Sequence, residues 1–464
     1  REQISENKEI TYLKQILGLE TNKQYKNVND LRYGSIMIMT DQDVDGSHIK
    51  GLLFNVFHSM WPELVKMGKF MTSMITPIIK VTKKNQVKSF YSLTEYEDWK
   101  KKNNNGKGFN VKYYKGLGTS STKEAKEYFQ NLKVVKYTWS DNSEKSIMLA
   151  FEKDKADDRK SWLKTYDRNQ ILDSDLTDVD YSDFVHRELK HFAHYDTSRS
   201  IPNLFDGLKT SQRKILFSCF KRNLKQEIRV AQLSGYVSEH AAYHHGEASL
   251  NGAIVGMGHD FVGSNNINIL YPSGQFGTRI QGGKDAASPR YIHTRLENIT
   301  DIIFNKDDLN VLNYLDDDGL PIEPEYYVPI LPMVLVNGCL GVGTGFSTNV
   351  PCFNPKELVT YLKDKMNDVQ NKIDIKPWYM GFKGDIIQHE KNSYIVKGKY
   401  RLVNYKTIEI TELPIGTWID DYKEFLETLI PDNIPKVKPS DKLKGKQPPK
   451  QKTYFLKNYE NHST

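Results

Sequence analysis

A short apolar run that leads into three alternating carboxylates is the feature that most constrains the fold of this chain. Residues 35–39 read SIMIM, and Asp41, Asp43 and Asp45 follow within TDQDVDGSH. An apolar run of this length is typical of a buried parallel strand, and open α/β sheets bind ligands beyond the carboxyl ends of such strands. The pattern therefore predicts an α/β sheet domain with an acidic ligand site at one edge.

The acidic stretch also matches the opening of a calcium-binding EF-hand loop. The twelfth position of such a loop must be acidic, but Leu52 stands there, and the loop would have to follow a helix. If the extended backbone continues instead, the three carboxylates lie on one side at intervals of about 7 Å. Their repulsion is relieved by Mg²⁺, which leaves room for water and phosphate ligands. A solvated acidic loop is the alternative.

Composition limits the class of protein without deciding it. A chain of 464 residues holds two to four domains, and 65 basic against 58 acidic residues permit a nucleic-acid partner. The three cysteines form no close pair, which argues against a disulfide framework and a zinc site and favours a reducing interior. We find no signal peptide. The most apolar stretch, residues 328–346, is too broken by Pro and Gly to predict a membrane span.

Strand-like and helix-like segments alternate up to about residue 165, after a polar, helical lead-in over residues 1–34. Helical periodicity over residues 51–68 ends at Gly68, and residues 73–83 and 109–118 read as strands. A second helix is predicted over residues 122–132, with Ser121 and Glu124 as a capping box. The intervening KGLGTSST favours a tight turn over a phosphate cradle, because it lacks the spacing of a nucleotide P-loop.

An acidic stretch over residues 173–183 has the composition of a connector, and the region after it is more basic. Residues 209–229 place cationic side chains around an apolar seam, a pattern that suits a solvated helix or a DNA-binding helix. Residues 271–295 then combine glycines with Arg279, Lys284, Arg290 and Arg295. Flexible, cationic chain of this kind suits close approach to a phosphate backbone.

Tyr291 lies among these cations and is a candidate nucleophile. A free tyrosine titrates near pH 10, so only about one in a thousand is ionised at neutral pH, at a cost of roughly 4 kcal/mol. The adjacent Arg290 and a cation-rich phosphate site would lower that cost.

The pieces TDQDVDGSH, KYYKGLGTS, RSIPNLFDGLKTSQRKILF, YHHGE, GQFGTR, GGKDAASPRY and PMVLVNGCLGVGTGFS occur in this order over nearly the whole chain. Together they resemble the breakage and reunion core of eukaryotic type IIA DNA topoisomerases. The resemblance implies a multidomain fold: an α/β Toprim domain over residues 35–165, a linker over 166–190, an α+β winged-helix domain over 172–329, and a mixed α/β tower over 330–464.

The resemblance also implies roles for individual residues. Tyr291 would attack a DNA phosphodiester and become linked to the 5′ end, assisted by Arg290, Arg199 of SRSIPN and His245 of YHHGE. Asp41, Asp43 and Asp45 match acids that bind Mg²⁺, in a two-metal site. Val342 stands where the family has an isoleucine that wedges between bases, and it is one methylene shorter. The remaining candidate DNA contacts are Lys209, Arg213, Lys214, Arg279 and Lys284.

For the whole protein, the resemblance implies a nuclear homodimer that passes one DNA duplex through another, with each active site shared between subunits. ATP would serve only a region absent from this chain, and the family's glutamate in EGDSA would lie upstream of Arg1. The chain also has a short linker after Tyr166 and a Lys-rich segment near residues 435–452 that resembles an insertion. Two alternatives remain open: another Toprim enzyme, such as a primase or type IA topoisomerase, and a noncatalytic winged-helix DNA-binding protein.

Overall fold

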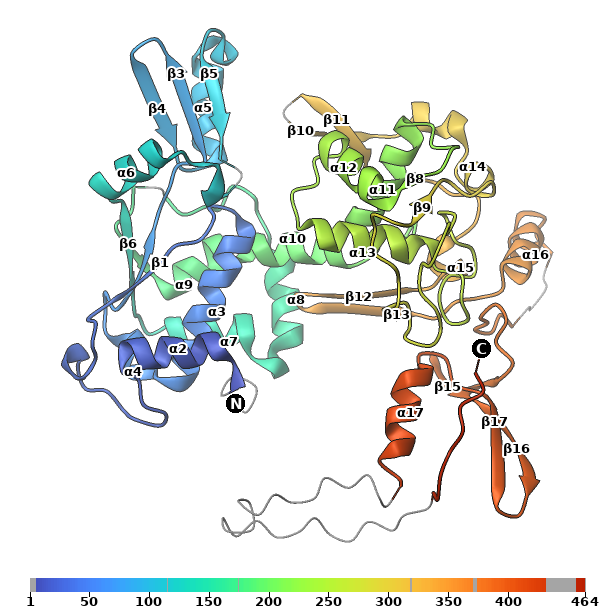
Figure 1. Cartoon of the computed structure of the whole chain (residues 1–464). Coiled ribbons are helices and arrows are strands. Elements are labelled where there is room, and N and C mark those ends of the chain that lie inside the picture. Colours follow the sequence, from blue (N-terminus) through green and yellow to red (C-terminus); the bar gives the residue numbers. More distant parts are fainter. Residues whose placement is uncertain are drawn as a thin grey trace, which may run out of the picture. The chain divides into compact units, whose positions relative to one another are not determined.

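The computed structural model describes residues 6–114, 116–173, 175–317, 319–369, 374–430 and 456–463. They fall into two compact units, Arg1–Ile201 with Val342–Ser347 and Pro202–Gly341 with Thr348–Thr464. Each unit has its own hydrophobic core (Figure 1). The Lys-rich segment predicted near residues 435–452 lies outside the described residues.

A four-stranded mixed sheet organises the first unit, in the order β1-β2-β6-β7. β1 (Ile36–Ile38) runs parallel to β2 (Met71–Met74), which runs antiparallel to β6 (Val134–Thr138), and β6 runs parallel to β7 (Asp178–Asp180). The strand predicted over residues 35–39 is therefore confirmed as a parallel strand. It is an edge strand rather than a fully buried one, and its side chains Met37 and Met39 are exposed.

Helices surround this sheet and supply most of its core. Aromatic side chains dominate that core, among them Trp61, Phe54 and Tyr137, each 1% exposed. The helices are α2 (Lys8–Leu17), α3 (Val44–Met60), α4 (Pro62–Lys66), α7 (Ser143–Phe151), α8 (Ala156–Lys164), α9 (Tyr181–Phe184) and α10 (Lys190–Ser200), with a π-helical turn (Val185–Leu189) joining α9 to α10.

A small antiparallel sheet, ordered β4-β3-β5, forms a separate layer of the first unit with its own core. It contains β3 (Ile79–Lys83), β4 (Gln86–Phe90) and β5 (Asn110–Tyr113), and it is followed by α6 (Thr122–Gln130), while α5 (Leu93–Lys102) packs beside β4. The single strand predicted over residues 73–83 is thus divided between two sheets. Pro77 lies at the break, and it lacks the N–H that a continuous ladder needs.

The segment predicted as a linker, residues 166–190, belongs to the first unit instead. β7 completes the four-stranded sheet, and α9 packs on α7. Asp178 and Asp180 flank the buried Val179, so a strand of three residues carries a single apolar side chain. A strand that short has too little alternation to be distinguished from an acidic loop.

Three helices, α11 (Thr210–Lys221), α12 (Val230–His240) and α13 (Glu247–Gly258), form the centre of the second unit. A two-stranded ladder of β8 (Ile228–Arg229) and β9 (His293–Thr294) lies beside them. α11 is shorter than the basic segment 209–229, because the chain turns at Asn223, which has a φ of 49°. The apolar seam predicted for this helix is buried, with Ile215 and Leu216 fully enclosed.

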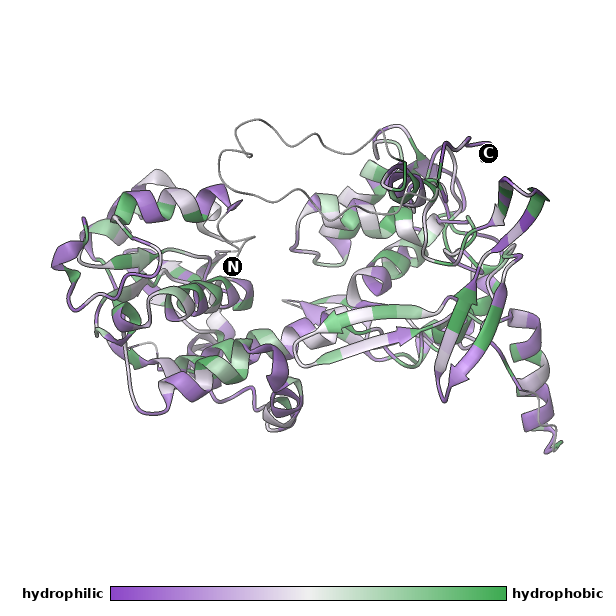
Figure 2. Ribbon diagram, turned by 90° about the horizontal axis from the view of Figure 1, so that it is seen from below, coloured by the Kyte–Doolittle hydropathy of each residue, from purple (hydrophilic) through white to green (hydrophobic). Residues whose placement is uncertain are grey.

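Two-stranded hairpins extend from the second unit. They are β10 (Tyr314–Asp317) with β11 (Leu320–Pro324), β12 (Cys339–Gly343) with β13 (Phe346–Val350), β14 (Asp385–Glu390) with β15 (Ser393–Lys397), and β16 (Lys399–Asn404) with β17 (Thr407–Glu412). Hydrophobic residues along β12 appear green in Figure 2. The remaining helices are α14 (Thr300–Ile303), α15 (Met333–Val336), α16 (Pro355–Met366) and α17 (Ile419–Glu427). Among the described residues, no helix is long and apolar enough to cross a membrane.

Candidate functional site

The three carboxylates do not follow an extended backbone, so the predicted 7 Å spacing is wrong. The chain leaves β1 at Ile38, turns, and enters α3, whose N-cap is Asp43. The Asp43 Oδ1 atom accepts a hydrogen bond of 2.7 Å from the Gly46 N–H. A side chain at Gly46 would place a Cβ 2.0 Å from the Asp41 carbonyl oxygen, so the turn requires glycine. Carboxylates at a helix N-terminus are favoured by the helix dipole.

Asp45, in the first turn of α3, forms an ion pair with Arg199 at the end of α10. The two guanidinium nitrogens Nη2 and Nη1 donate to the two carboxylate oxygens at 2.9 and 3.3 Å. The guanidinium also lies 4.9 Å from the Tyr195 ring centroid. Partial burial opposes ionisation, but the hydrogen bonds and charge of Asp45 outweigh it and raise the pKa of Arg199. The structure thus brings together two predicted site residues that are 154 positions apart.

Further contacts hold the start of α3 in place. Glu188, in the π turn, accepts a hydrogen bond of 2.7 Å from Ser47 Oγ and pairs closely with the buried Lys50 ammonium. Burial lowers the pKa of Lys50, but the Glu188 charge more than reverses this and raises it to about 12. His48 stacks on Phe192 of α10, with ring centroids 3.9 Å apart. The acidic motif therefore rests on a fixed helix rather than a solvated loop.

Asp41 lies next to the turn that follows β5. Gly116 in that turn has a φ of 120°, and a Cβ there would meet the Asp41 carboxylate at 3.4 Å. Thr119 closes the turn, because its Oγ1 and N–H both donate to the Gly116 carbonyl, at 2.7 and 3.1 Å. This confirms the tight turn predicted for the KGLGTSST stretch, of which Lys115 lies outside the described residues.

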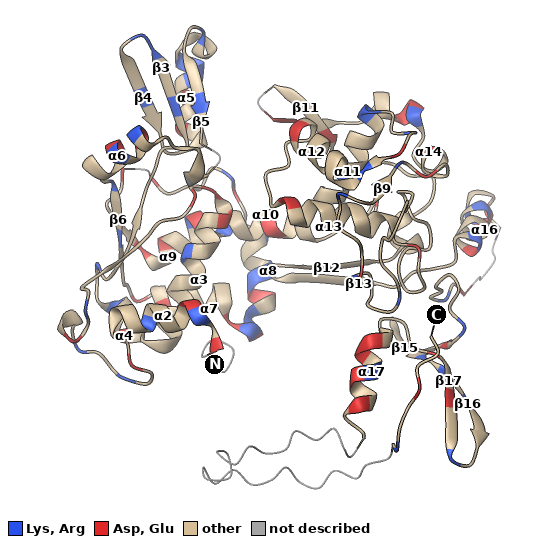
Figure 3. Ribbon diagram, viewed as in Figure 1, with Lys and Arg blue, Asp and Glu red and all other residues tan. Residues whose placement is uncertain are grey.

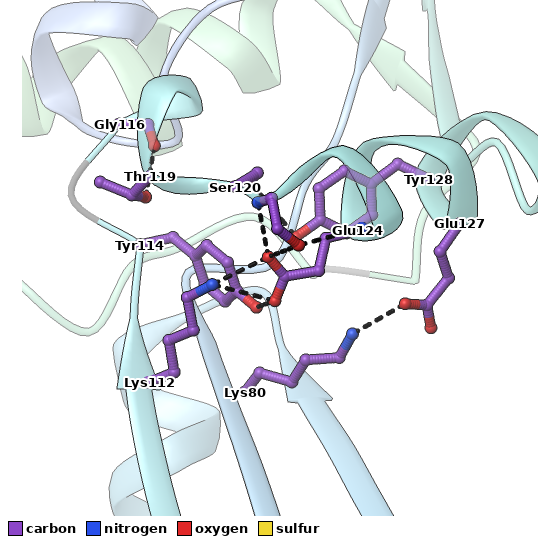
Figure 4. Close-up of polar contacts among 10 residues, drawn as sticks. Lys80, Lys112, Tyr114, Gly116, Thr119, Ser120, Glu124, Glu127 and Tyr128 are labelled. Atoms are coloured by element: carbon purple, nitrogen blue, oxygen red, sulfur yellow. Dashed lines mark hydrogen bonds and ion pairs between the residues drawn. The ribbon is translucent and has the colours of Figure 1, made fainter.

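A hydrogen-bond network centred on Glu124 anchors both ends of that turn (Figure 4). The Glu124 carboxylate accepts from Tyr114 Oη, from Lys112 Nζ at 2.8 Å, and from the N–H and Oγ of Ser121, both at 2.8 Å. Partial burial opposes ionisation of Glu124, but these donors lower its pKa to about 2. The capping box predicted from Ser121 and Glu124 is confirmed. Tyr114 was missed, because no local pattern places a tyrosine beside a capping carboxylate.

The acidic motif presents a partial ligand set for a divalent cation. Asp41 and Asp43 are exposed, whereas Asp45 is engaged by Arg199. Across the described ranges, no three or more His, Cys, Asp or Glu side chains converge tightly enough to hold a metal ion by themselves. One or two carboxylates with several waters and substrate phosphates are, however, the usual ligands of protein-bound Mg²⁺. The donor chemistry fits that mode of binding.

Tyr291 is presented to solvent by buried neighbours. Its side chain is 71% exposed, while Ile292 and Thr294 are buried. The Tyr291 N–H donates to the Ser288 carbonyl at 2.9 Å, and the Arg290 guanidinium carbon lies 5.8 Å from the tyrosine ring centroid. This arrangement leaves the phenol free to meet a large substrate, with a cation beside it.

His245 is exposed in the turn between α12 and α13. Its ring centroid lies 5.4 Å from that of the buried Tyr243, in an edge-on orientation. The turn passes through Ala242, which has a φ of 48°. Both Tyr291 and His245 thus extend from the second unit on short, well-anchored segments.

Three of the five basic residues predicted to contact DNA are committed to internal carboxylates instead. Arg213 is buried and binds Asp206 through Nε at 2.7 Å and Nη2 at 3.0 Å. Lys214 pairs with the buried Glu323 at 2.8 Å, and Arg279 pairs with Glu412 at 2.6 Å. The helical pattern showed that these side chains are basic. It could not show that each faces a carboxylate from a distant part of the chain.

Lys209 and Lys284 retain accessible side chains, partly exposed and exposed respectively. Figure 3 shows how basic and acidic side chains are interspersed over the second unit. Val342 is 72% exposed on β12, and Leu340, two residues earlier on the same face, is 65% exposed. An exposed apolar pair on a hairpin agrees with the wedge role predicted for Val342 better than with a packed position.

The fold and these motifs agree with comparisons to known proteins. A model of the family described as DNA gyrase/topoisomerase IV matches residues 199–446. A second model, of the C-terminal associated domain of TOPRIM, matches residues 74–197. The chain belongs to the DNA gyrase/topoisomerase IV family.

Within that class, the chain is most informatively compared with the eukaryotic enzymes. It is 53% identical over 441 residues to DNA topoisomerase 2 of Arabidopsis thaliana, covering 93% of this chain and 30% of that protein. It is 48% identical over 441 residues to DNA topoisomerase 2-alpha of Homo sapiens, covering 91% and 29%. The resemblance predicted from the motifs is therefore confirmed, and the chain spans about three-tenths of the length of these relatives.

A solved structure supports the same assignment. The DNA-binding, cleavage and re-ligation domain of Plasmodium falciparum topoisomerase II superposes with a TM-score of 0.74 at 48% sequence identity. The match covers 93% of this chain and 59% of that one.

Proposed function

We propose that this chain is the DNA breakage and reunion core of a type II DNA topoisomerase. The observation that carries the proposal is Tyr291: its phenol is 71% exposed beside Arg290, on a segment whose neighbouring side chains are buried. A nucleophile that must reach a phosphodiester inside a duplex needs this combination of access and rigid support. Family membership and the relatives named above support it independently.

In the proposed reaction, the Tyr291 oxygen attacks a backbone phosphorus, and the bond from that phosphorus to the 3′ oxygen breaks. The DNA 5′ phosphate becomes linked to tyrosine, and the 3′ oxygen leaves with a proton. One phosphodiester replaces another, so resealing by the 3′ hydroxyl needs no external energy source. His245 would accept the tyrosine proton through water, and Arg290 and Arg199 would stabilise the charge that develops on the phosphate.

We assign the divalent cation to the acidic motif. Asp41 and Asp43 would hold Mg²⁺ together with water, and Asp45 would join them by exchanging its contact with Arg199. When bound, the cation would neutralise phosphate charge. The exposed position of Asp41 and Asp43 supports this proposal.

The domain assignments follow the same reasoning. We assign the four-stranded sheet and its helices to a Toprim domain, α11 to α13 with the β8–β9 ladder to a winged-helix domain, and the later hairpins to a tower. The partners would be double-stranded DNA, contacted by Lys209, Lys284 and Val342, and a second copy of the chain. The whole protein would act in the nucleus and use ATP through a region outside this chain.

Substitution of Tyr291 by phenylalanine tests the central assignment. Tyr291→Phe removes the nucleophilic oxygen and no charge, so covalent DNA attachment should vanish while DNA affinity stays within about tenfold. The measurement is denaturing electrophoresis of end-labelled duplex DNA after incubation with Mg²⁺, beside a binding titration. Tyr271→Phe is the matched control, because Tyr271 also lies beside an arginine, with Arg295 4.3 Å from its ring centroid.

The products separate the alternatives. Adducts on both strands with a double-strand break indicate a type II enzyme, and adducts on one strand indicate a type IA enzyme. A protein that only binds DNA would give no adduct with the unsubstituted chain. Adducts that persist in Tyr291→Phe would overturn the assignment of the nucleophile.

A further inference from the structure

The tip of the β12–β13 hairpin is bound to α10 by a small set of polar contacts within the first unit. The Thr344 N–H and Oγ1 both donate to the Asp196 Oδ2 atom, at 2.9 and 3.0 Å. The Thr197 Oγ1 in turn donates to the Thr344 carbonyl at 3.2 Å. All the polar groups of this one tip residue are thus bound to two consecutive residues of a single helix.

The glycines on either side of Thr344 show how closely the tip approaches. A Cβ on Gly343 would lie 3.0 Å from the Thr197 Cα, and one on Gly345 would lie 3.0 Å from the Arg159 Cβ. Gly345 also has a φ of 77°, which other residues rarely adopt. The tip therefore has little freedom to shift while these contacts persist.

The helix that holds the tip also holds the acidic motif. Asp196 and Arg199 are three residues apart on α10, so their side chains project from neighbouring positions on the helix. Arg199 pairs with Asp45, as described above, while Asp196 binds Thr344. Val342 lies only two residues before Thr344 and is 72% exposed.

We propose that Asp196 is a positioning residue: by fixing Thr344, it holds Val342 at the angle from which it enters the DNA base stack. The proposal rests on the proposed function of Val342 as a wedge. Unstacking a base step costs a few kcal/mol, so a wedge on a hairpin with a loose tip would be pushed aside rather than inserted. Hydrogen bonds to an ionised carboxylate are stronger than neutral ones and suit this purpose. Asp196 itself touches no DNA in this mechanism.

Substitutions of Asp196 and Val342 together test the proposal. DNA bending is measured by energy transfer between dyes at the two ends of a short duplex, and cleavage is measured on the same duplex. Asp196→Ala should lower the bent fraction and the cleaved product together by about tenfold, the loss expected for charge-assisted hydrogen bonds. In the Val342→Ala background, the same change should have no further effect, because the wedge that Asp196 positions is already gone.

Two further variants separate positioning from general damage. Asp196→Asn keeps an oxygen that can accept from both Thr344 donors, so it should restore most of the bending. Ser200→Ala removes the other partner of the carboxylate, whose Oγ donates to the Asp196 Oδ1 atom at 3.2 Å, and leaves Thr344 untouched. It should behave like the unsubstituted chain.

Amide hydrogen exchange provides a readout that does not depend on the wedge. Asp196→Ala should speed exchange at Thr344, whose N–H is the direct donor, without changing exchange in the core helix α11. Unchanged exchange at Thr344, or equal losses of bending in the Val342 and Val342→Ala backgrounds, would overturn the positioning role. If exchange rises as expected but Val342→Ala leaves bending intact while Tyr291 still forms adducts, the wedge is wrong and the positioning role falls with it. The assignment of the nucleophile would then still stand.

Discussion

At the scale of single residues, the basic side chains of the second unit serve two different purposes. Arg213 binds Asp206, which is fully buried and also accepts from the Leu208 and Tyr327 N–H groups at 2.9 and 3.0 Å. Lys284 is exposed, in a glycine-rich stretch with no buried carboxylate among its described contacts. The first residue should therefore affect stability, and the second should affect DNA binding.

We expect Arg213→Ala to destabilise the second unit by about 3–5 kcal/mol, because it leaves an uncompensated buried charge on Asp206. Thermal unfolding measures this loss, and the exposed Arg222 at the end of the same helix supplies the control variant Arg222→Ala. Equal stabilities for the two variants would show that the buried pair contributes nothing.

Lys284→Ala should leave the unfolding temperature unchanged and weaken DNA binding in a salt-dependent way. If the ammonium contacts a phosphate, the slope of log K against log salt should fall in magnitude by about 1. The measurement is a binding titration at several salt concentrations. A slope identical to that of the unsubstituted chain would remove Lys284 from the DNA surface.

At the scale of secondary-structure elements, α6 illustrates what a local pattern can and cannot predict. Ser121 and Glu124 predicted its start correctly, since a capping box involves residues only three apart. The same reasoning predicted β1, β5 and the tight turn after β5. It missed β7, which has one buried side chain, and the division between β2 and β3. Pairing partners decide those elements, and they are distant in sequence.

The candidate site shows the same limit. Tyr291 and the three carboxylates could be selected from the sequence, because their motifs are local. The bond between Asp45 and Arg199, and the burial of Arg213 and Lys214, depend on contacts between segments that only the fold brings together. The expected extended geometry at Asp41 to Asp45 failed because Asp43 favours a helix N-cap.

Glu124 gives the α6 turn a defined dependence on pH. Its folded-state pKa is lowered to about 2 from an ordinary value of 4.5, so its contribution to stability is fully present above about pH 4.5 and is lost as the pH falls toward 2. Glu124→Gln should therefore unfold at a lower temperature than the unsubstituted chain at neutral pH, and the difference should shrink across this acidic window.

Thermal unfolding at a series of pH values measures that difference. Glu127→Gln is the matched control on the same helix, because its side chain is 51% exposed and pairs only with Lys80 among the contacts described for it, whereas Glu124 is 15% exposed. A difference for Glu124→Gln that stayed constant down to pH 2 would contradict a lowered pKa.

At the scale of the whole molecule, the proposed dimer makes a prediction about how its active sites are composed. If each site combines the carboxylates of one protomer with the tyrosine of its partner, an Asp43→Asn chain mixed with a Tyr291→Phe chain forms heterodimers with one intact site. Those heterodimers should nick one DNA strand and leave the other whole. Asn is chosen at position 43 because it can still cap α3 through the Gly46 N–H, while removing the charge.

The control for this mixture is the Asp43→Asn, Tyr291→Phe double variant mixed with either single variant, which creates no intact site in any arrangement. Strand-resolved electrophoresis distinguishes nicks from double-strand breaks. Sites that lie within one protomer would yield no nicks from the original mixture, although the unsubstituted chain cleaves under the same conditions.

The π-helical turn between α9 and α10 has a consequence for how the length of this protein can vary. A π turn holds one residue more than the α-helical turn it replaces, so Val185–Leu189 carries a spare position inside a continuous helical run. Deleting one residue there would restore an α-helix and keep Arg199 facing Asp45. The same deletion inside α10 would rotate Arg199 by about 100° away from it. Single-residue gaps among natural variants of this helix should therefore fall at the π turn and nowhere beyond it.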